Sequence, residues 1–131
     1  MPSIFTKIIN REIPAYVVAE DEYFIAFLDV MPLVEGHTLV VPKAEVDYIF
    51  DLDATTLANL MVFAQRVAKA VKKSISCKRV GVAVIGLEVP HTHVHLVPLN
   101  TMNDINFTMP KLKLTDETMR AVANRIKANI D

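Results

Sequence analysis

The sequence predicts an α+β fold in which an antiparallel sheet carries one long helix and flanking shorter helices. Apolar residues recur at spacings of three and four over residues 54–74 and again over 115–130, as they do in amphipathic helices. Short β-branched and aromatic runs, bounded by proline, glycine or acidic turns, lie on both sides of the longer helical segment. Antiparallel runs of strands with a helix between them favour α+β over a doubly wound parallel sheet.

Each element has its own local signal. Residues 3–9 carry isoleucine and phenylalanine at helical spacing, and Pro14 prevents the helix from continuing. Asp53 can cap the long helix, and lysines near its end suit the helix dipole. The segment 79–85 is apolar on both faces, which predicts a central strand. The expected strands are residues 15–18, 24–28, 37–41, 79–85 and 93–99.

Length and composition limit the classes of protein. The 131 residues suit a single domain, residues 1–131, with a core at about 3–99 and a C-terminal extension whose helix spans about 115–130. A net charge of −1 argues against a long nucleic acid as partner, and three scattered glycines cannot form a glycine-rich phosphate loop. No apolar run is long enough to cross a membrane, and the lone Cys77 fits a reducing compartment, so we expect a cytoplasmic protein.

Three of the four histidines form the most informative pattern. His91, His93 and His95 alternate along a predicted strand, so their side chains lie on one face at intervals of roughly 6.5 to 7 Å. Buried imidazoles all need hydrogen bonds, which makes such a row a poor choice for packing alone. Two kinds of chemistry remain open on spacing alone. The row could bind zinc or iron, or one histidine could be a nucleophile whose neighbours bind phosphate oxygens.

The wider sequence resembles the histidine triad (HIT) family of nucleotide hydrolases and transferases, over about residues 3–99. The family signature alternates three histidines with apolar residues, as residues 91–97 nearly do. Several separated motifs occur in the same order as in the family. They are Lys7-Ile8-Ile9, Glu12-Ile13-Pro14, Glu20-Asp21-Glu22, Phe27-Leu28-Asp29-Val30, Pro32, Gly36-His37, Leu39-Val40 and Pro42-Lys43.

This resemblance implies a role for each site residue. His93 matches the nucleophile that takes a nucleoside monophosphate as a covalent phosphoramidate, His95 matches a residue that contacts the α-phosphate, and His91 one that orients or electrostatically supports the site. His37 is expected in the same pocket, so that all four histidines line it, and Asp29 matches the carboxylate that binds the ribose hydroxyls. Apolar positions matching the base and ribose pocket are Ile4, Phe5, Ile8, Val30 and Leu39.

The implied activity is hydrolysis at the α-phosphorus of a purine nucleotide conjugate, such as a nucleoside phosphoramidate or a dinucleoside polyphosphate. The family also implies a homodimer whose two sheets join into one. Two alternatives are a metal-dependent phosphoesterase with the histidines as ligands and a nucleotide-binding protein without turnover. The second is suggested by a shortened connection before the triad and by Glu88, which replaces a serine or threonine beside the leaving group. Thr92 also departs from the signature, which prefers an apolar residue there.

Some bacterial family members bind structural zinc through an N-terminal Cys-x-x-Cys and a histidine after the Pro-Lys pair. The matching positions here are Ser3, Thr6 and Glu45. Hydroxyls and a carboxylate do not make the soft ligand set that structural zinc prefers. We therefore expect no structural metal and no cofactor.

Overall fold

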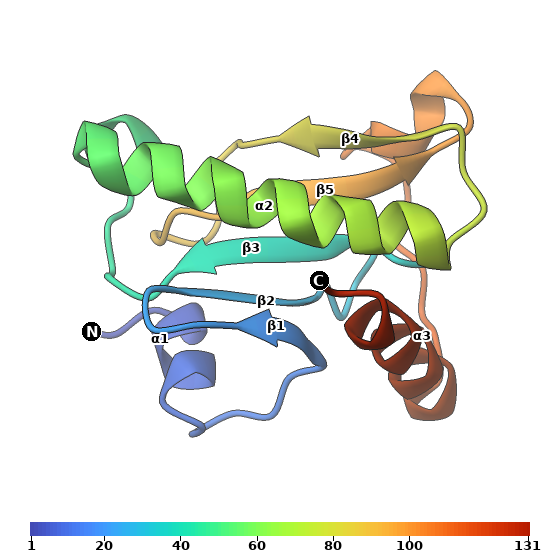
Figure 1. The fold of residues 1–131 in the computed structure, drawn as a ribbon, viewed down its shortest axis with the longest axis horizontal. Helices are drawn as coiled ribbons and strands as arrows, with labels where there is room; N and C mark the ends of the chain where they lie inside the picture. The colour runs from blue at the N-terminus through green and yellow to red at the C-terminus, as the bar shows by residue number, and fades with distance from the viewer.

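Five strands form one antiparallel sheet in the order β1-β2-β3-β5-β4, in a computed structural model that describes residues 1–131 (Figure 1). The strands are β1 (Val17–Glu20), β2 (Phe24–Leu28), β3 (Thr38–Pro42), β4 (Arg79–Ala83) and β5 (Val94–Leu99). The helices are α1 (Ile4–Ile9), α2 (Ala54–Ser74) and α3 (Asp116–Ala128), with short 3-10 turns η1 (Ile49–Asp51) and η2 (Met102–Ile105). The predicted α+β fold class is confirmed.

Helices α2 and α3 cover one face of the sheet, and α2 runs roughly along the direction of the strands, in front of the sheet in Figure 1. The side chain of Asp53 accepts a hydrogen bond from the Thr56 backbone N–H at 2.7 Å, so α2 begins where the sequence predicts. Its buried side interlocks with residues of α3 and with alternate residues of the strands. This core includes Leu60, Phe63, Val67, Val71, Val40, Val94, Leu96, Met119, Val122 and Ile126.

The short helix α1 covers the opposite face of the sheet. Phe5 and Ile8 are its buried residues, and they form a smaller apolar cluster with Ile25, Phe27, Leu39 and Val41 of β2 and β3. Residues that neighbour one another along a strand point to opposite faces, so Leu39 belongs to the α1 side and Val40 to the α2 side. A residue paired directly with Leu39 across the sheet therefore also lies on the α1 side.

The prediction of a central position for residues 79–85 is wrong. Strand β4 pairs only with β5 and forms an edge of the sheet. Apolar side chains on both faces of a strand therefore do not by themselves show that the strand is buried. No residue of β4 is buried, and Val82 and Ile85 remain exposed at this edge. The other strands were located to within about two residues; β1, for example, begins at Val17 rather than at residue 15.

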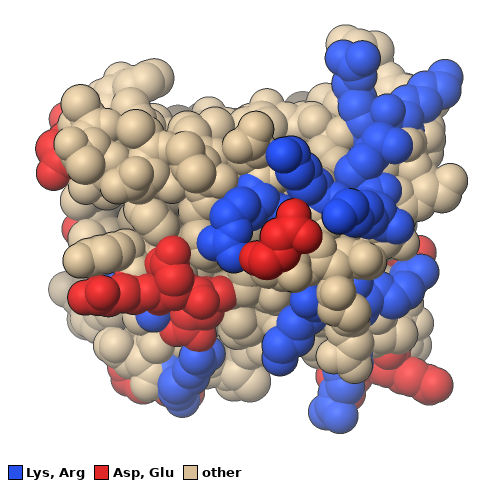
Figure 2. Space-filling view, in the orientation of Figure 1, with Lys and Arg blue, Asp and Glu red and all other residues tan.

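No helix is long and apolar enough to cross a membrane. On the face shown in Figure 2, lysine and arginine side chains gather toward the end of α2 that carries Lys72 and Lys73, and acidic side chains gather toward the other side of the view. This is the α2 side of the sheet, opposite to the α1 side.

Candidate active site

The histidines gather on the α1 side of the sheet. His95 lies in β5 directly opposite Leu39 of β3, which fixes its face. His91 and His93 precede β5 in a turn that Thr92 holds. The backbone N–H and the hydroxyl of Thr92 each donate to the Val46 carbonyl oxygen at 2.7 Å. The residue that departs from the family signature therefore anchors the turn that carries His91 and His93.

His93 is held in one tautomer. Its Nδ1 lies 2.7 Å from the carbonyl oxygen of His91, which can only accept, so Nδ1 carries the proton. In the neutral ring Nε2 then bears the lone pair. Every fully buried side-chain nitrogen and oxygen in the protein has a hydrogen-bond partner, whereas Nε2 of His93 has none within the chain. Nε2 is therefore not fully buried, and it is accessible as a free nucleophilic atom.

His37 and His95 form a directed chain of hydrogen bonds. The Leu33 backbone N–H donates to Nδ1 of His37 at 3.0 Å, so neutral His37 has its proton on Nε2. That Nε2 lies 2.9 Å from Nδ1 of His95 and donates to it, which leaves the proton of neutral His95 on its own Nε2. The outcome is an N–H donor on His95 beside the nucleophile, since the His93 and His95 ring centres are 4.9 Å apart.

Both rings of this chain are neutral at physiological pH. Burial, helped by the charges of His95, Lys111 and His93, lowers the pKa of His37 to about 3. Burial, helped by His93 and Lys111, lowers the pKa of His95 to about 4. Neutrality preserves the direction of the hydrogen bonds.

His91 lies behind the pocket rather than in its wall, contrary to the expectation that all four histidines line it. Its side chain is 0 % exposed, its Nε2–H donates to the Pro42 carbonyl oxygen at 2.8 Å, and its Nδ1 accepts from the Ser3 hydroxyl at 2.7 Å. Burial lowers the pKa of His91. Both nitrogens are thus occupied, and His91 acts on the site through its carbonyl oxygen.

Asp29 lies beside the His37–His95 pair. One carboxylate oxygen is 3.7 Å from Nε2 of His37, and the other accepts a hydrogen bond from the Met31 backbone N–H at 2.9 Å. Burial raises the pKa of Asp29, and the charge of Glu88 raises it further. Glu88 is exposed on the loop before the triad. Asp29 is thus the carboxylate that lies against the histidine pair.

The five apolar residues expected around the base and ribose do not all lie together. Phe5, Ile8 and Leu39 are buried on the α1 side, and the Phe5 ring meets the His93 ring at 5.0 Å. Ile4 is half-exposed on the same helix. Val30 is exposed and lines a hollow that contains none of the four histidines.

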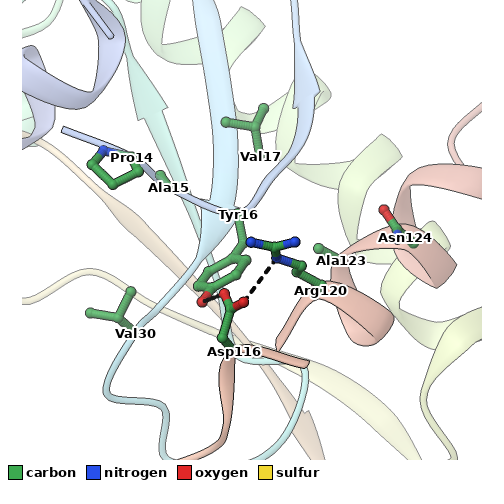
Figure 3. A pocket seen from close by; sticks show the side chains of 9 residues that line it. All are labelled: Pro14, Ala15, Tyr16, Val17, Val30, Asp116, Arg120, Ala123 and Asn124. Carbon is green, nitrogen blue, oxygen red and sulfur yellow. Dashed lines mark hydrogen bonds and ion pairs between the residues drawn. The ribbon is translucent and has the colours of Figure 1, made fainter. Parts of the chain in front are cut away.

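That other hollow, of about 570 Å³, lies between β1 and α3 (Figure 3). The Tyr16 hydroxyl donates to Asp116 at 2.5 Å, and Arg120 forms an ion pair with the same carboxylate at 3.0 Å. These polar groups satisfy one another, and none of the four histidines lines the hollow. Size alone therefore does not identify the reactive site.

His93 borders a second hollow of about 390 Å³. Its walls come from η1, with Ile49 and Phe50, and from the loop of residues 84–87. Binding pockets for small ligands begin at about 300 Å³ and are mostly apolar with a few polar groups. This hollow has that character, with the His93 ring as its reactive group.

Two residues of the segment after β5 were missed by sequence reasoning. The Phe107 ring lies 4.7 Å from the His95 ring and 6.2 Å from the His37 ring, so it covers their hydrogen-bonded pair. The Lys111 ammonium donates to the Phe107 carbonyl oxygen at 2.7 Å. The only signal in the sequence is an aromatic residue among polar ones, in the part of the chain outside the resemblance.

Metal ligation can be examined at two places. Asp29, His37 and His95 present ligand atoms within 4.8 Å of one another, but the facing nitrogens of the two histidines already bond to each other. Ser3, Thr6 and Glu45 do not form a zinc site either: Ser3 and Thr6 donate to Glu45, and Ser3 to His91. The donors at these positions do not fit structural zinc.

Comparison with known proteins decides the family. A sequence profile described as "HIT domain" matches residues 10–102. The chain belongs to the HIT family. An uncharacterized HIT-like protein of Borreliella burgdorferi is 34 % identical over 97 % of both chains. Adenosine 5'-monophosphoramidase of Saccharomyces cerevisiae is 38 % identical over 72 % of this chain and 61 % of its own.

A solved structure supports the same assignment. The crystal structure of a HIT-like protein from Bartonella henselae superposes with a TM-score of 0.84 at 33 % identity, covering 98 % of this chain and 96 % of that one. The sequence-based identification of the HIT family is confirmed by the profile, by the relatives and by this fold.

Proposed function

We propose that this HIT-type nucleotide hydrolase cleaves nucleotide conjugates at the α-phosphorus through a covalent nucleotidyl-histidine on His93. The tautomer of His93 carries the proposal. Nδ1–H donates to the His91 carbonyl, so Nε2 is free to attack a phosphorus atom, and the residue His93 borders the 390 Å³ hollow. The relationship to a yeast enzyme named adenosine 5'-monophosphoramidase supports an adenosine phosphoramidate as substrate.

The reaction proceeds in two displacements. In the first, Nε2 of His93 forms a bond to the α-phosphorus, the bond to the leaving group breaks, and the leaving group takes a proton from water. The Nδ1–H of His93 stays on the His91 carbonyl, which stabilises the positive charge that the ring acquires. In the second, water attacks the phosphorus, the phosphorus–nitrogen bond breaks, and a proton returns to solvent, so that His93 is neutral again.

His95 serves as a hydrogen-bond donor to a non-bridging phosphate oxygen. Its position beside His93 and the proton on its Nε2 suit this role. His37 and the Leu33 N–H keep that proton on the outward nitrogen. Asp29 is proposed to accept hydrogen bonds from the ribose hydroxyls, because its carboxylate has capacity left beyond the Met31 N–H.

The decisive experiment combines turnover with trapping. We expect the native protein to hydrolyse adenosine phosphoramidate, with diadenosine polyphosphates tested in parallel, and a rapidly quenched sample to carry a nucleotidyl group on a peptide containing His93. His93→Ala should abolish both, while Cys77→Ser, which changes a residue outside the site, should retain both. Full activity in His93→Ala would refute the covalent mechanism.

A metal-dependent phosphoesterase is the competing function, because Asp29, His37 and His95 could together offer ligands to a metal ion. A metal-dependent phosphoesterase would lose activity in a chelator and regain it with a divalent ion. The covalent mechanism predicts equal turnover in both conditions, since none of its steps requires a metal ion.

We also propose that the protein is a homodimer that pairs two copies of β4. This strand is an edge with unpaired backbone groups, and exposed apolar residues continue from it into the following loop. They are Val82, Val84, Ile85 and Leu87. Sedimentation should give twice the chain mass, and Val82→Arg should give monomers; a monomeric native protein would contradict the proposal.

Cys77 is the only cysteine in the chain and is unpaired. We propose a reducing compartment, the cytoplasm, as the place of action. Cell fractionation tests this directly.

A further inference from the structure

A cluster of polar residues joins the N-terminus to the histidine site. The Ser3 backbone N–H and the Thr6 hydroxyl both donate to the same Glu45 carboxylate oxygen at 2.6 Å. The Ser3 hydroxyl accepts a hydrogen bond from the Thr6 backbone N–H at 3.0 Å and lies 2.7 Å from Nδ1 of His91. Ser3 and His91 are buried, with 6 % and 0 % of their surface exposed. The cluster therefore connects α1, the loop after β3 and the triad.

Only one hydroxyl proton can serve His91. The Nε2 proton of His91 is committed to the Pro42 carbonyl, so Nδ1 is an acceptor in the neutral ring. The Thr6 hydroxyl is 3.4 Å from that Nδ1, but its proton is directed at Glu45. The Ser3 hydroxyl is therefore the donor to His91.

The effect of Ser3 reaches the nucleophile in one further step. His91 is fixed at both ring nitrogens, and its backbone carbonyl accepts the Nδ1–H of His93 at 2.7 Å. The same helix that begins at Ser3 places Phe5 edge-on to the His93 ring, 5.0 Å between centres. The segment around Ser3 thus contacts the catalytic histidine on one side and orients its hydrogen-bond acceptor on the other.

We propose that Ser3 is a positioning residue, which holds the ring of His91 and thereby keeps His93 in the tautomer that has its lone pair on Nε2. The role of that lone pair rests on the proposed function. Without the hydroxyl, Nδ1 of His91 becomes a buried acceptor with no donor, a state that proteins avoid. The ring then gains by moving or by changing tautomer. Either change shifts the carbonyl that fixes His93.

The test compares two helix caps. Ser3→Ala removes the cap of α1 together with the bond to His91, whereas Thr115→Ala removes the cap of α3, which accepts from the Thr118 N–H at 3.1 Å, and does not touch the histidines. We expect Ser3→Ala to lower kcat about fivefold to tenfold, the rate equivalent of one lost hydrogen bond, and to leave KM nearly unchanged. Thr115→Ala should keep the native kcat. Ser3→Thr, which retains a hydroxyl, should restore most of the rate.

A second measurement does not depend on turnover. The ¹⁵N chemical shifts of His93 should report an Nδ1-protonated ring in the native protein and in Thr115→Ala, and a mixture of tautomers in Ser3→Ala. An unchanged tautomer in Ser3→Ala would overturn the proposal, as would an equal loss of kcat in both cap variants. Because the shifts can be read in a protein that turns nothing over, failure of the proposed activity is distinguishable from failure of the role of Ser3.

Discussion

The buried histidines should make folding stability depend on pH well above the range in which carboxylates titrate. The ordinary pKa of histidine is about 6.5, whereas His37 titrates at about 3 and His95 at about 4 in the folded protein. Below pH 6.5 these two histidines therefore bind protons in the unfolded chain but not in the folded chain. Stability contributed by these neutral rings is complete above pH 6.5 and falls as the pH falls toward their folded pKa values.

The size of this effect follows from the linkage relation. Between pH 7.5 and pH 5 each ring loses about 2 kcal/mol of unfolding free energy, so the pair loses about 4 kcal/mol. His91, whose pKa is also lowered by burial, changes in the same direction. The window ends at pH 5 because ordinary carboxylates, with pKa values near 4, titrate below it.

Urea unfolding at pH 7.5, 6 and 5 measures this loss. His37→Asn is the informative variant, because the amide oxygen can accept from the Leu33 N–H as Nδ1 does and the side chain does not titrate. We expect the variant to be less stable overall but to lose about 2 kcal/mol less than the native protein across the window. The chain has only four histidines, all of them in or behind the site. No surface histidine therefore contributes to the change of unfolding free energy with pH. Identical slopes in both proteins would refute the reasoning.

Two further perturbations have definite expected outcomes. Gly36→Ala should cost about 2 kcal/mol of stability in urea unfolding, because φ is +95° there and a Cβ would lie 2.7 Å from Ile75 Cγ1; a native midpoint would contradict this. Lys111→Met should raise the pKa values of His95 and His37, because the Lys111 charge lowers both, and NMR titration that finds them unchanged would place that charge farther away.

The long helix shows what a sequence can establish alone. The apolar periodicity of residues 54–74 is regular, and the capping Asp53 has no competing role, so both ends of α2 were predicted correctly. Local signals of this kind depend on few distant contacts. The row of histidines predicted the site but not its geometry, because only His95 lies in β5, whereas His91 and His93 precede that strand.

The features that the sequence predicts wrongly or misses depend on contacts between residues that are far apart in the chain. The apolar character of β4 predicts a central strand, although β4 lies at an edge of the sheet. The sequence predicts that His91 supports the site from within the pocket, whereas Pro42 and Ser3, which are far from it in sequence, hold it behind His93. Phe107 lies in a segment without periodicity, so nothing in the sequence indicated that it covers His95.

The chain of hydrogen bonds from Leu33 to His95 has a consequence for evolution and for engineering. It begins at a peptide N–H, which has no tautomer and does not titrate near neutral pH. Every amino acid except proline supplies that backbone donor at position 33. The side chain of Leu33 is buried, so an apolar replacement that fits its place would keep the donor and with it the position of the proton on His95.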